Sequence, residues 1–182
     1  GVSKQARETT MALVKLARQK DIKVSFDFNY RTKLWSIEEA REAFIEILPY
    51  VNVCFGSYMD VLTIRKEKRT IDSFDEKIKL LQELQREYNF DQIFTTEREI
   101  LDDNEQNLSC AVITGTEVHK LGPVKVNVLE RIGTGDSFVA GALYGLANSY
   151  SLQDTLDFAL SSFAMKHTIV GDFQIASKEA VQ

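Results

Sequence analysis

Residues 128–138 combine glycines with a carboxylate in a pattern that suits phosphate chemistry. They read Val-Leu-Glu-Arg-Ile-Gly-Thr-Gly-Asp-Ser-Phe, so a strand-like stretch passes through Gly133, Thr134 and Gly135 into a helical pattern. Glycine has no Cβ and lets backbone amides converge on an anion, and the first helical turn adds N–H groups without intrahelical acceptors. The segment therefore predicts a phosphate-binding turn.

Asp136 follows directly in that turn, where a carboxylate would repel phosphate unless it faced another group. If it faces an alcohol, it can accept the hydroxyl proton as the oxygen attacks a phosphoryl group, a contribution of roughly 10²–10⁴ in rate. The same pattern also fits a tight turn in which Asp136 only caps the helix. The residues alone leave both interpretations open.

A second polar group follows residues 22–28, where apolar and polar side chains alternate. Asp27 and Asn29 are two positions apart and share one side of a strand end, where open α/β sheets bind ligands. The guanidinium of Arg31 could hold a carboxylate with two hydrogen bonds. Arg31 could equally be a surface arginine paired with an acid. We therefore treat Arg31 as a candidate residue for binding the carboxylate of an acidic substrate.

The elements that position these residues alternate along the chain. Helical spacing predicts helices up to about Lys20, from the Ser36 capping box to Pro49, over 59–65 and 78–88, and in two segments after Thr134. Strands are predicted over 22–28, 51–55 and 92–96, followed by a hairpin around Gly115 and a further strand over 124–128. This alternation predicts one α/β domain over residues 1–182, with an antiparallel edge on a parallel sheet.

Composition narrows the class of protein. The 182 residues are 44% hydrophobic and 27% charged with a net charge of −5, which favours a soluble globular chain over a nucleic-acid binder. No apolar run approaches a membrane helix and the start lacks a signal-peptide core, so we expect no membrane contact and a cytoplasmic location. Cys54 and Cys110 are expected to be buried thiols, and no residue cluster predicts a protein metal site.

Three segments resemble the ribokinase-like (PfkB) carbohydrate kinases. Residues 130–141 resemble the family signature Asp-x-x-Gly-Ala-Gly-Asp-Ser/Ala-Phe, with Glu130 for Asp and Thr134 for Ala. Residues 27–35 are similar to the Asp-x-Asn-x-Arg-x-x-Leu-Trp of the 2-keto-3-deoxygluconate kinase branch. Residues 166–173 are similar to its Lys-His-Ser/Thr-x-Pro-Gly-Asp-Phe, with Val170 for Pro. The resemblance implies a ribokinase-like three-layer α/β/α sandwich (Rossmann-like), truncated at the N-terminus.

The resemblance also implies roles for individual residues. Asp136 corresponds to the general base, and the amides of the Gly-x-Gly before it correspond to an anion hole. Asp172 matches a substrate-binding position and is otherwise an ordinary turn residue, whereas His167 either edges the adenine pocket or belongs to the core. The implied nucleotide-binding residues are Asn29, Thr96, Arg98, Gly133, Thr134, Gly135 and His167. The implied substrate-binding residues are Asp27, Arg31, Asp136 and Asp172.

Two family features are altered. Ser57-x-x-Asp60 stands where Asn-x-x-Glu is usual, and it is equally a helix cap with a first-turn acid. The Thr-x-Gly-x-x-Gly nucleotide loop is not present after Thr95. The chain also corresponds only to the C-terminal part of the family's sequence. We therefore expect this piece to bind nucleotide weakly and to show negligible turnover.

Together these observations predict a 2-keto-3-deoxygluconate kinase that transfers the γ-phosphoryl group of ATP to form the 6-phospho product. The expected cofactors are ATP and Mg²⁺, with the ion held mostly by phosphates and water. The expected partners are the sugar acid and ATP, and the resemblance implies a homo-oligomeric parent protein. The alternatives are another PfkB sugar kinase, of the fructokinase or ribokinase type, and a non-catalytic fragment that keeps only the nucleotide-binding half.

Overall fold

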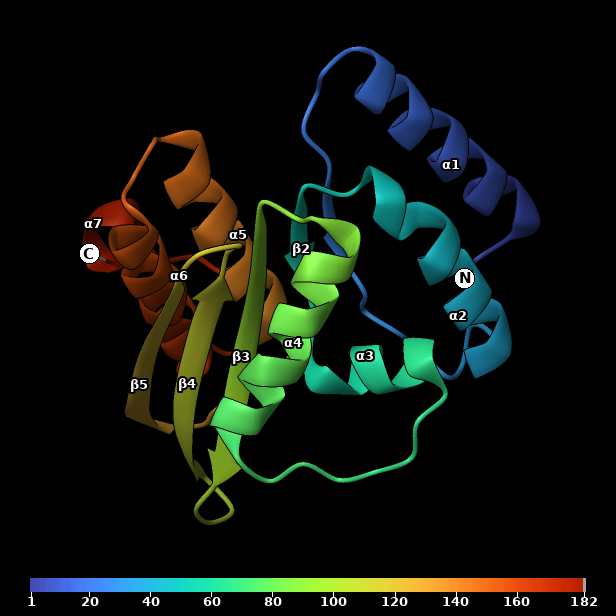
Figure 1. Ribbon diagram of the computed structural model, residues 1–182. Coiled ribbons are helices and arrows are strands. Elements are labelled where there is room, and N and C mark those ends of the chain that lie inside the picture. The colour runs from blue at the N-terminus through green and yellow to red at the C-terminus, as the bar shows by residue number, and fades with distance from the viewer. Residues whose placement is uncertain (182) are drawn as a thin grey trace. The chain divides into compact units, whose positions relative to one another are not determined.

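The computed structural model describes residues 1–181, which form two compact units (Figure 1). Unit 1 comprises Gly1–Phe94 with Ile113–Glu117, and unit 2 comprises Thr95–Val112 with the described residues from Val118 onward. The elements up to the start of β3 belong to unit 1: α1 (Lys4–Gln19), β1 (Ser25–Asp27), α2 (Ile37–Ile47), η1 (Leu48–Tyr50), β2 (Val53–Phe55), α3 (Tyr58–Arg65) and α4 (Phe74–Tyr88). Strands β3 (Gln92–Ile100), β4 (Glu105–Ile113) and β5 (Val118–Asn127) follow, and then α5 (Thr134–Ala147), α6 (Leu152–Lys166) and α7 (Lys178–Val181).

The strands form one mixed sheet in the order β1-β2-β3-β4-β5. Strands β1, β2 and β3 are parallel, with Asp27 opposite Phe55 and Phe55 opposite Phe94. Strands β4 and β5 are joined by a short turn in which the Thr114 amide donates to the Glu117 carbonyl over 2.9 Å, so the chain reverses direction there. The predicted α/β class, with an antiparallel edge on a parallel sheet, is confirmed.

Aromatic packing in unit 1 holds the segment that follows β1. The ring centroid of Phe44 lies 4.9 Å from that of Phe28 and 5.8 Å from that of Trp35, both in edge-to-face geometry. Helix α2 begins at the predicted capping box, in which the Ser36 amide donates to Glu39 Oε2 and the Glu39 amide donates to Ser36 Oγ. The residues between Phe28 and α2 are thus anchored at both ends.

In unit 2, α5 and α6 pack against each other, and α6 also contacts β5 (Figure 1). The two helices approach closely at Gly141, where a Cβ would lie 2.9 Å from the Cα of Ala159. Phe138 and Phe163 meet edge to face with centroids 5.9 Å apart. Since Phe138 belongs to the first half of α5, this packing fixes the start of that helix.

Three sequence predictions need correction in detail. Strand β1 covers only Ser25–Asp27, because β2 offers just three residues to pair with it, and Ile22 is 57% exposed. Strand β3 continues to Ile100 instead of ending at Thr96. The second hairpin strand and the further strand are one element, β5, which contains the cis Gly122-Pro123 bond. The buried state of both cysteines is confirmed.

No helix among residues 1–181 combines the length and the apolar character needed to cross a membrane.

Candidate active site

The glycine turn before α5 has the geometry of a helix N-terminal binding turn. Gly133 is the N-cap of α5 and has φ 74°, a left-handed backbone that other residues adopt only with strain. A Cβ at Gly133 would also lie 2.5 Å from the carbonyl oxygen of Asp172. Only glycine therefore fits at this position, and the first-turn amides of α5 lack intrahelical acceptors.

The carboxylate of Glu130 holds the residues immediately before Gly133. Its Oε1 accepts hydrogen bonds from the amides of Arg131, at 2.8 Å, and Ile132, at 3.1 Å. These two bonds lower the pKa of Glu130, because they stabilise the charged carboxylate. Glutamate at the position of the family's aspartate thus closes a local turn with its own side chain.

Asp136 and Gly135 present the open side of this turn. Asp136 is the third residue of α5 and is exposed, and a Cβ at Gly135 would meet no atom within 4 Å. Asp172 is also exposed, and its carbonyl oxygen approaches Gly133. The structure therefore gathers four predicted residues, Gly133, Gly135, Asp136 and Asp172, around one solvent-accessible turn.

Arg98 reaches the same turn from β3. Its Nη2 donates to Thr134 Oγ1 over 3.0 Å, and Thr134 Oγ1 donates to the carbonyl of Arg131 over 2.9 Å. The guanidinium carbon lies 5.1 Å from the ring centroid of Phe163. Although the residue as a whole is exposed, partial burial of the Arg98 guanidinium, and to a lesser degree the charge of Arg131, lowers the pKa of Arg98. Thr96 lies half-buried two residues earlier on β3.

His167 lies in the core rather than at the surface of a pocket. Its side chain is fully buried, its Nδ1 lies 2.7 Å from the Phe163 carbonyl, and its ring meets that of Phe163 edge to face. Burial lowers the pKa of His167. Its own carbonyl accepts from the amides of Leu129 and Glu130. Of the two interpretations open from the sequence, the structure favours the core residue, because no ring atom faces solvent.

The second predicted group lies in unit 1. Asp27 and Asn29 line a cavity of about 290 Å³, whose walls also include Trp35 and Phe44. Asn29 has φ 39°, so the chain turns sharply just after β1. Arg31 is exposed, does not line this cavity, and donates from Nη1 to the carbonyl of Tyr30 over 3.2 Å. Two of the three predicted residues therefore share a cavity, and Arg31 points elsewhere.

Asp60 is engaged at the start of α3. Its Oδ2 accepts from the amide of Ser57, at 2.7 Å, and from the Ser57 hydroxyl, at 2.8 Å. Burial raises the pKa of Asp60 although these hydrogen bonds oppose the shift. Within residues 1–181 no group of three or more His, Cys, Asp or Glu residues could hold a metal ion. The geometry fits the helix-cap interpretation of Ser57-x-x-Asp60.

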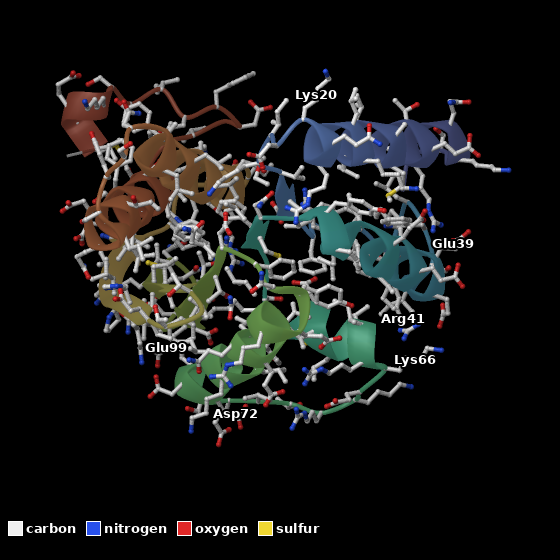
Figure 2. The ribbon with its side chains drawn as sticks, turned by 45° about the horizontal axis from the view of Figure 1, so that its top comes forward. Lys20, Glu39, Arg41, Lys66, Asp72 and Glu99 are labelled. Atoms are coloured by element: carbon white, nitrogen blue, oxygen red, sulfur yellow. The ribbon has the colours of Figure 1, made fainter. Side chains whose placement is uncertain are left out.

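The larger groove of unit 1, of about 640 Å³, lies between α2 and the end of α3. Figure 2 labels Arg41 and Lys66, which project from these two elements on the same side of the unit. None of the residues predicted to bind substrate or nucleotide lines this groove. Cavity size therefore does not locate the predicted chemistry, whereas the strand ends and the glycine turn do.

Sequence reasoning gave no role to Lys166, although it belongs to a quoted motif. Its side chain is completely buried, and its Nζ donates to the carbonyls of Ile169, at 3.0 Å, and Gly171, at 2.7 Å. Lysine is almost never fully buried without partners. The position of Lys166 as the last residue of a helical pattern offered no signal, because helix ends commonly carry exposed basic residues.

Known proteins resemble this chain over nearly all of its length. It is 26% identical over 181 residues to a 2-dehydro-3-deoxygalactonokinase of Haloferax volcanii, a match covering 100% of the chain and 52% of that protein. The crystal structure of 2-dehydro-3-deoxygluconokinase from Thermotoga maritima superposes with a TM-score of 0.89 at 29% identity, covering 98% of this chain and 54% of that one. A fructokinase double mutant from Vibrio cholerae, at 18% identity, superposes with a TM-score of 0.71 over 94% of this chain and 52% of that one, which shows the shared fold alone.

These comparisons confirm the ribokinase-like fold, and the chain spans about half the length of the relatives it matches. The family model for the pfkB carbohydrate kinases matches residues 1–171. The glycine turn, its exposed carboxylate and the parallel strands before it lie within that match. This chain belongs to the pfkB family of carbohydrate kinases.

Proposed function

We propose that the protein carrying this chain phosphorylates 2-keto-3-deoxygluconate with ATP to give the 6-phospho product. The observation that supports this most is the exposed Asp136 in the first turn of α5, beside Gly135, whose Cβ position has open space around it. In phosphoryl transfer the protein contributes mainly positioning and charge stabilisation. A carboxylate beside the first turn of a helix supplies groups of the kind that this task needs.

In this proposal Asp136 accepts the proton of the terminal hydroxyl as that oxygen attacks the γ-phosphorus. The amides of Gly133, Thr134 and Gly135 stabilise the charge on the transferring group. The Thr134 amide donates to the Arg131 carbonyl over 3.5 Å in the structure and would exchange that long bond for the phosphate. The open space at Gly135 would admit a phosphate close to the backbone. The left-handed backbone of Gly133 redirects the chain just before α5 begins.

The chain supplies donors for ATP but few ligands for a metal. Arg98 and Thr134 lie at the turn, and Asp60 is already engaged by Ser57. Mg²⁺ prefers oxygen ligands and usually keeps several waters, so the residues present fit an ion held by phosphates and water. Bound Mg²⁺ would neutralise charge on the phosphates, and Arg98 would add to that effect through its anchored guanidinium.

The choice of a sugar acid rests on Arg31 and on the relatives. Both 2-dehydro-3-deoxy sugar kinases described above are 26–29% identical to this chain. Arg31 is exposed and lies two residues after Asn29, which lines the cavity, and a guanidinium can bind a carboxylate with two hydrogen bonds. A fructokinase-type substrate is the competing function, since the fold is shared with a fructokinase.

A substrate panel tests the proposal. The protein carrying this chain is assayed for ATP-dependent phosphorylation of 2-keto-3-deoxygluconate, 2-keto-3-deoxygalactonate, fructose and ribose, with product position read by ³¹P NMR. We expect the highest kcat/KM with the gluconate acid. A clear preference for fructose would contradict the proposal. The 182-residue chain assayed alone is expected to bind ATP weakly with negligible turnover, and full activity would contradict that expectation.

A further inference from the structure

The structure assigns Lys166 a role as a positioning residue that holds the glycine turn in shape and adds a buried positive charge behind it. The inference rests on the proposed use of that turn as an anion site. It concerns only residues of unit 2, which lie in two segments: residues 129–136 and residues 166–172.

The two segments are joined by hydrogen bonds on one flank and by close packing on the other. The carbonyl of His167 accepts from the amides of Leu129, at 2.8 Å, and Glu130, at 3.2 Å. Further along, the carbonyl of Asp172 lies so close to Gly133 that a Cβ there would approach it to 2.5 Å. The shape of the glycine turn therefore depends on the path of residues 167–172.

Lys166 fixes that path from the inside. Its ammonium donates to the carbonyls of Ile169 and Gly171, two positions of the same loop, at 3.0 and 2.7 Å. Gly171 has φ 96°, so the loop bends sharply at the point that the ammonium contacts. With both carbonyls held, the carbonyl of Asp172, one residue further on, is placed against Gly133.

The choice of a charged side chain needs a reason beyond holding two carbonyls. Burying an ammonium costs free energy unless it is well paired, and a neutral donor could satisfy carbonyls with less desolvation. The Lys166 Cε lies 3.5 Å from the Cβ position of Gly133, which places the charge directly behind the anion turn. Because Lys166 is fully buried, solvent and salt screen this charge only weakly. It therefore adds to the attraction of the turn for a phosphate.

The groups around the ammonium stabilise its burial and offset part of its positive charge. The carboxylate of Glu130 is attracted to Lys166, and it accepts hydrogen bonds from the amides of Arg131 and Ile132. Lys166 is also the last residue of α6, where the negative end of the helix dipole favours a cation. The anion turn is thus held by a carboxylate on one side and an ammonium on the other.

The test compares Lys166→Met with Lys77→Met, which removes the other buried lysine, in α4 of unit 1. Inorganic tripolyphosphate is titrated into the ¹⁵N-labelled chain, and the amide signals of Gly133 and Gly135 are followed. We expect Kd to rise about tenfold or more in Lys166→Met, with both glycine signals displaced before ligand is added, and to stay unchanged in Lys77→Met. Wild-type affinity and unshifted glycine signals in Lys166→Met would overturn the inference.

If Lys166→Met does not fold, a measurement on the wild-type chain tests the inference instead. Its Lys166 ammonium should give a slowly exchanging ¹⁵N signal that shifts as tripolyphosphate binds. A Gly135 response without any Lys166 response would overturn the inference. If the wild-type glycine amides do not respond to tripolyphosphate at all, the proposed anion site itself fails. The two failures are therefore distinguishable.

Discussion

The two groups of predicted site residues differ in how the structure holds them. In unit 2 the glycine turn is supported by Glu130, Lys166 and the His167 carbonyl, all through hydrogen bonds shorter than 3.3 Å. In unit 1 Asp27, the last residue of β1, is exposed, as are Asn29 and Arg31 after it. The Arg31 guanidinium contacts only a neighbouring carbonyl among the bonds described for it.

This difference matches the two tasks that the proposal assigns. Stabilising a transferring phosphoryl group demands fixed donors, because misplaced dipoles lose most of their effect. Recognising a substrate tolerates side chains that adjust as the ligand binds, at the cost of ordering them. We therefore expect substitutions at the turn to affect catalysis with any sugar, and substitutions after β1 to affect the choice of sugar.

The largest expected effect is at Asp136. In the protein carrying this chain, Asp136→Asn should lower kcat by roughly 10²–10⁴ with every accepted sugar, since the amide cannot accept the hydroxyl proton. KM should change little. A coupled assay of ADP release measures both constants, with Asp103→Asn, an exposed loop aspartate, as the control. Unchanged phosphorylation in Asp136→Asn would remove the basis of the proposed mechanism.

Substitution of Arg31 tests the second group of residues, which is expected to select the sugar. Arg31→Met should lower kcat/KM for the keto acid roughly 10- to 150-fold. This corresponds to the loss of one charge-assisted hydrogen bond of about 1.5–3 kcal/mol. Turnover of any neutral sugar should be unchanged in the same variant. Lys33→Met, another exposed cation of this segment, serves as the control. An equal loss with acidic and neutral sugars would show that Arg31 does not select the substrate.

Alanine substitutions at Gly133 and Gly135 distinguish the effect of backbone strain on stability from the effect of a side chain on ligand binding. Gly133→Ala should destabilise the chain by about 1–2 kcal/mol from the left-handed backbone alone, with a further cost from the clash with Asp172. Gly135→Ala should leave the free energy of unfolding nearly unchanged, because its Cβ meets open space, but should weaken tripolyphosphate binding. Urea unfolding and titration measure the two effects. Equal stabilities of the two variants would contradict the described turn.

The smallest effect is the pH dependence from Glu130. Its folded-state pKa is lowered, so the unfolded chain binds more protons in the window below the ordinary glutamate value of 4.5. The stabilisation is present above that value and is lost as pH falls through the lowered pKa. The stability difference between the wild type and Glu130→Gln should therefore shrink on acidification. Urea unfolding at neutral and acidic pH measures it, with Glu42→Gln as the control; a pH-independent difference would contradict the prediction.

Local patterns predicted most of the elements. The predicted caps at Ser36 and Ser57 mark helix starts that the structure retains. These signals are local, because a cap depends on residues within one turn. Strand ends were less accurate: β1 is shorter and β3 longer than predicted, since ladder length depends on the partner strand. The single strand β5 was likewise divided, because Gly122-Pro123 is typical of a turn.

The site residues also fall into those that local patterns predicted and those that depend on tertiary contacts. The order Gly-x-Gly-Asp before a helix is a local pattern, and it predicted the turn at which α5 begins, where Asp136 is exposed. The roles of Arg98 and Lys166 depend on segments more than 30 residues away in the sequence, so spacing could not show them. His167 is the opposite case. Histidine often takes part in catalysis, but the side chain of His167 is buried in the core against Phe163.

The sequence by itself determined the α/β alternation, the family and the place of the glycine turn, because these depend on short-range periodicity and on residues that only a tight turn accepts. The tertiary structure alone decided which charges surround that turn. The hydrogen bond from Arg98 to Thr134 and the approach of Lys166 to Gly133 depend on where distant segments meet, and a buried charge acquires its effect only from the groups around it.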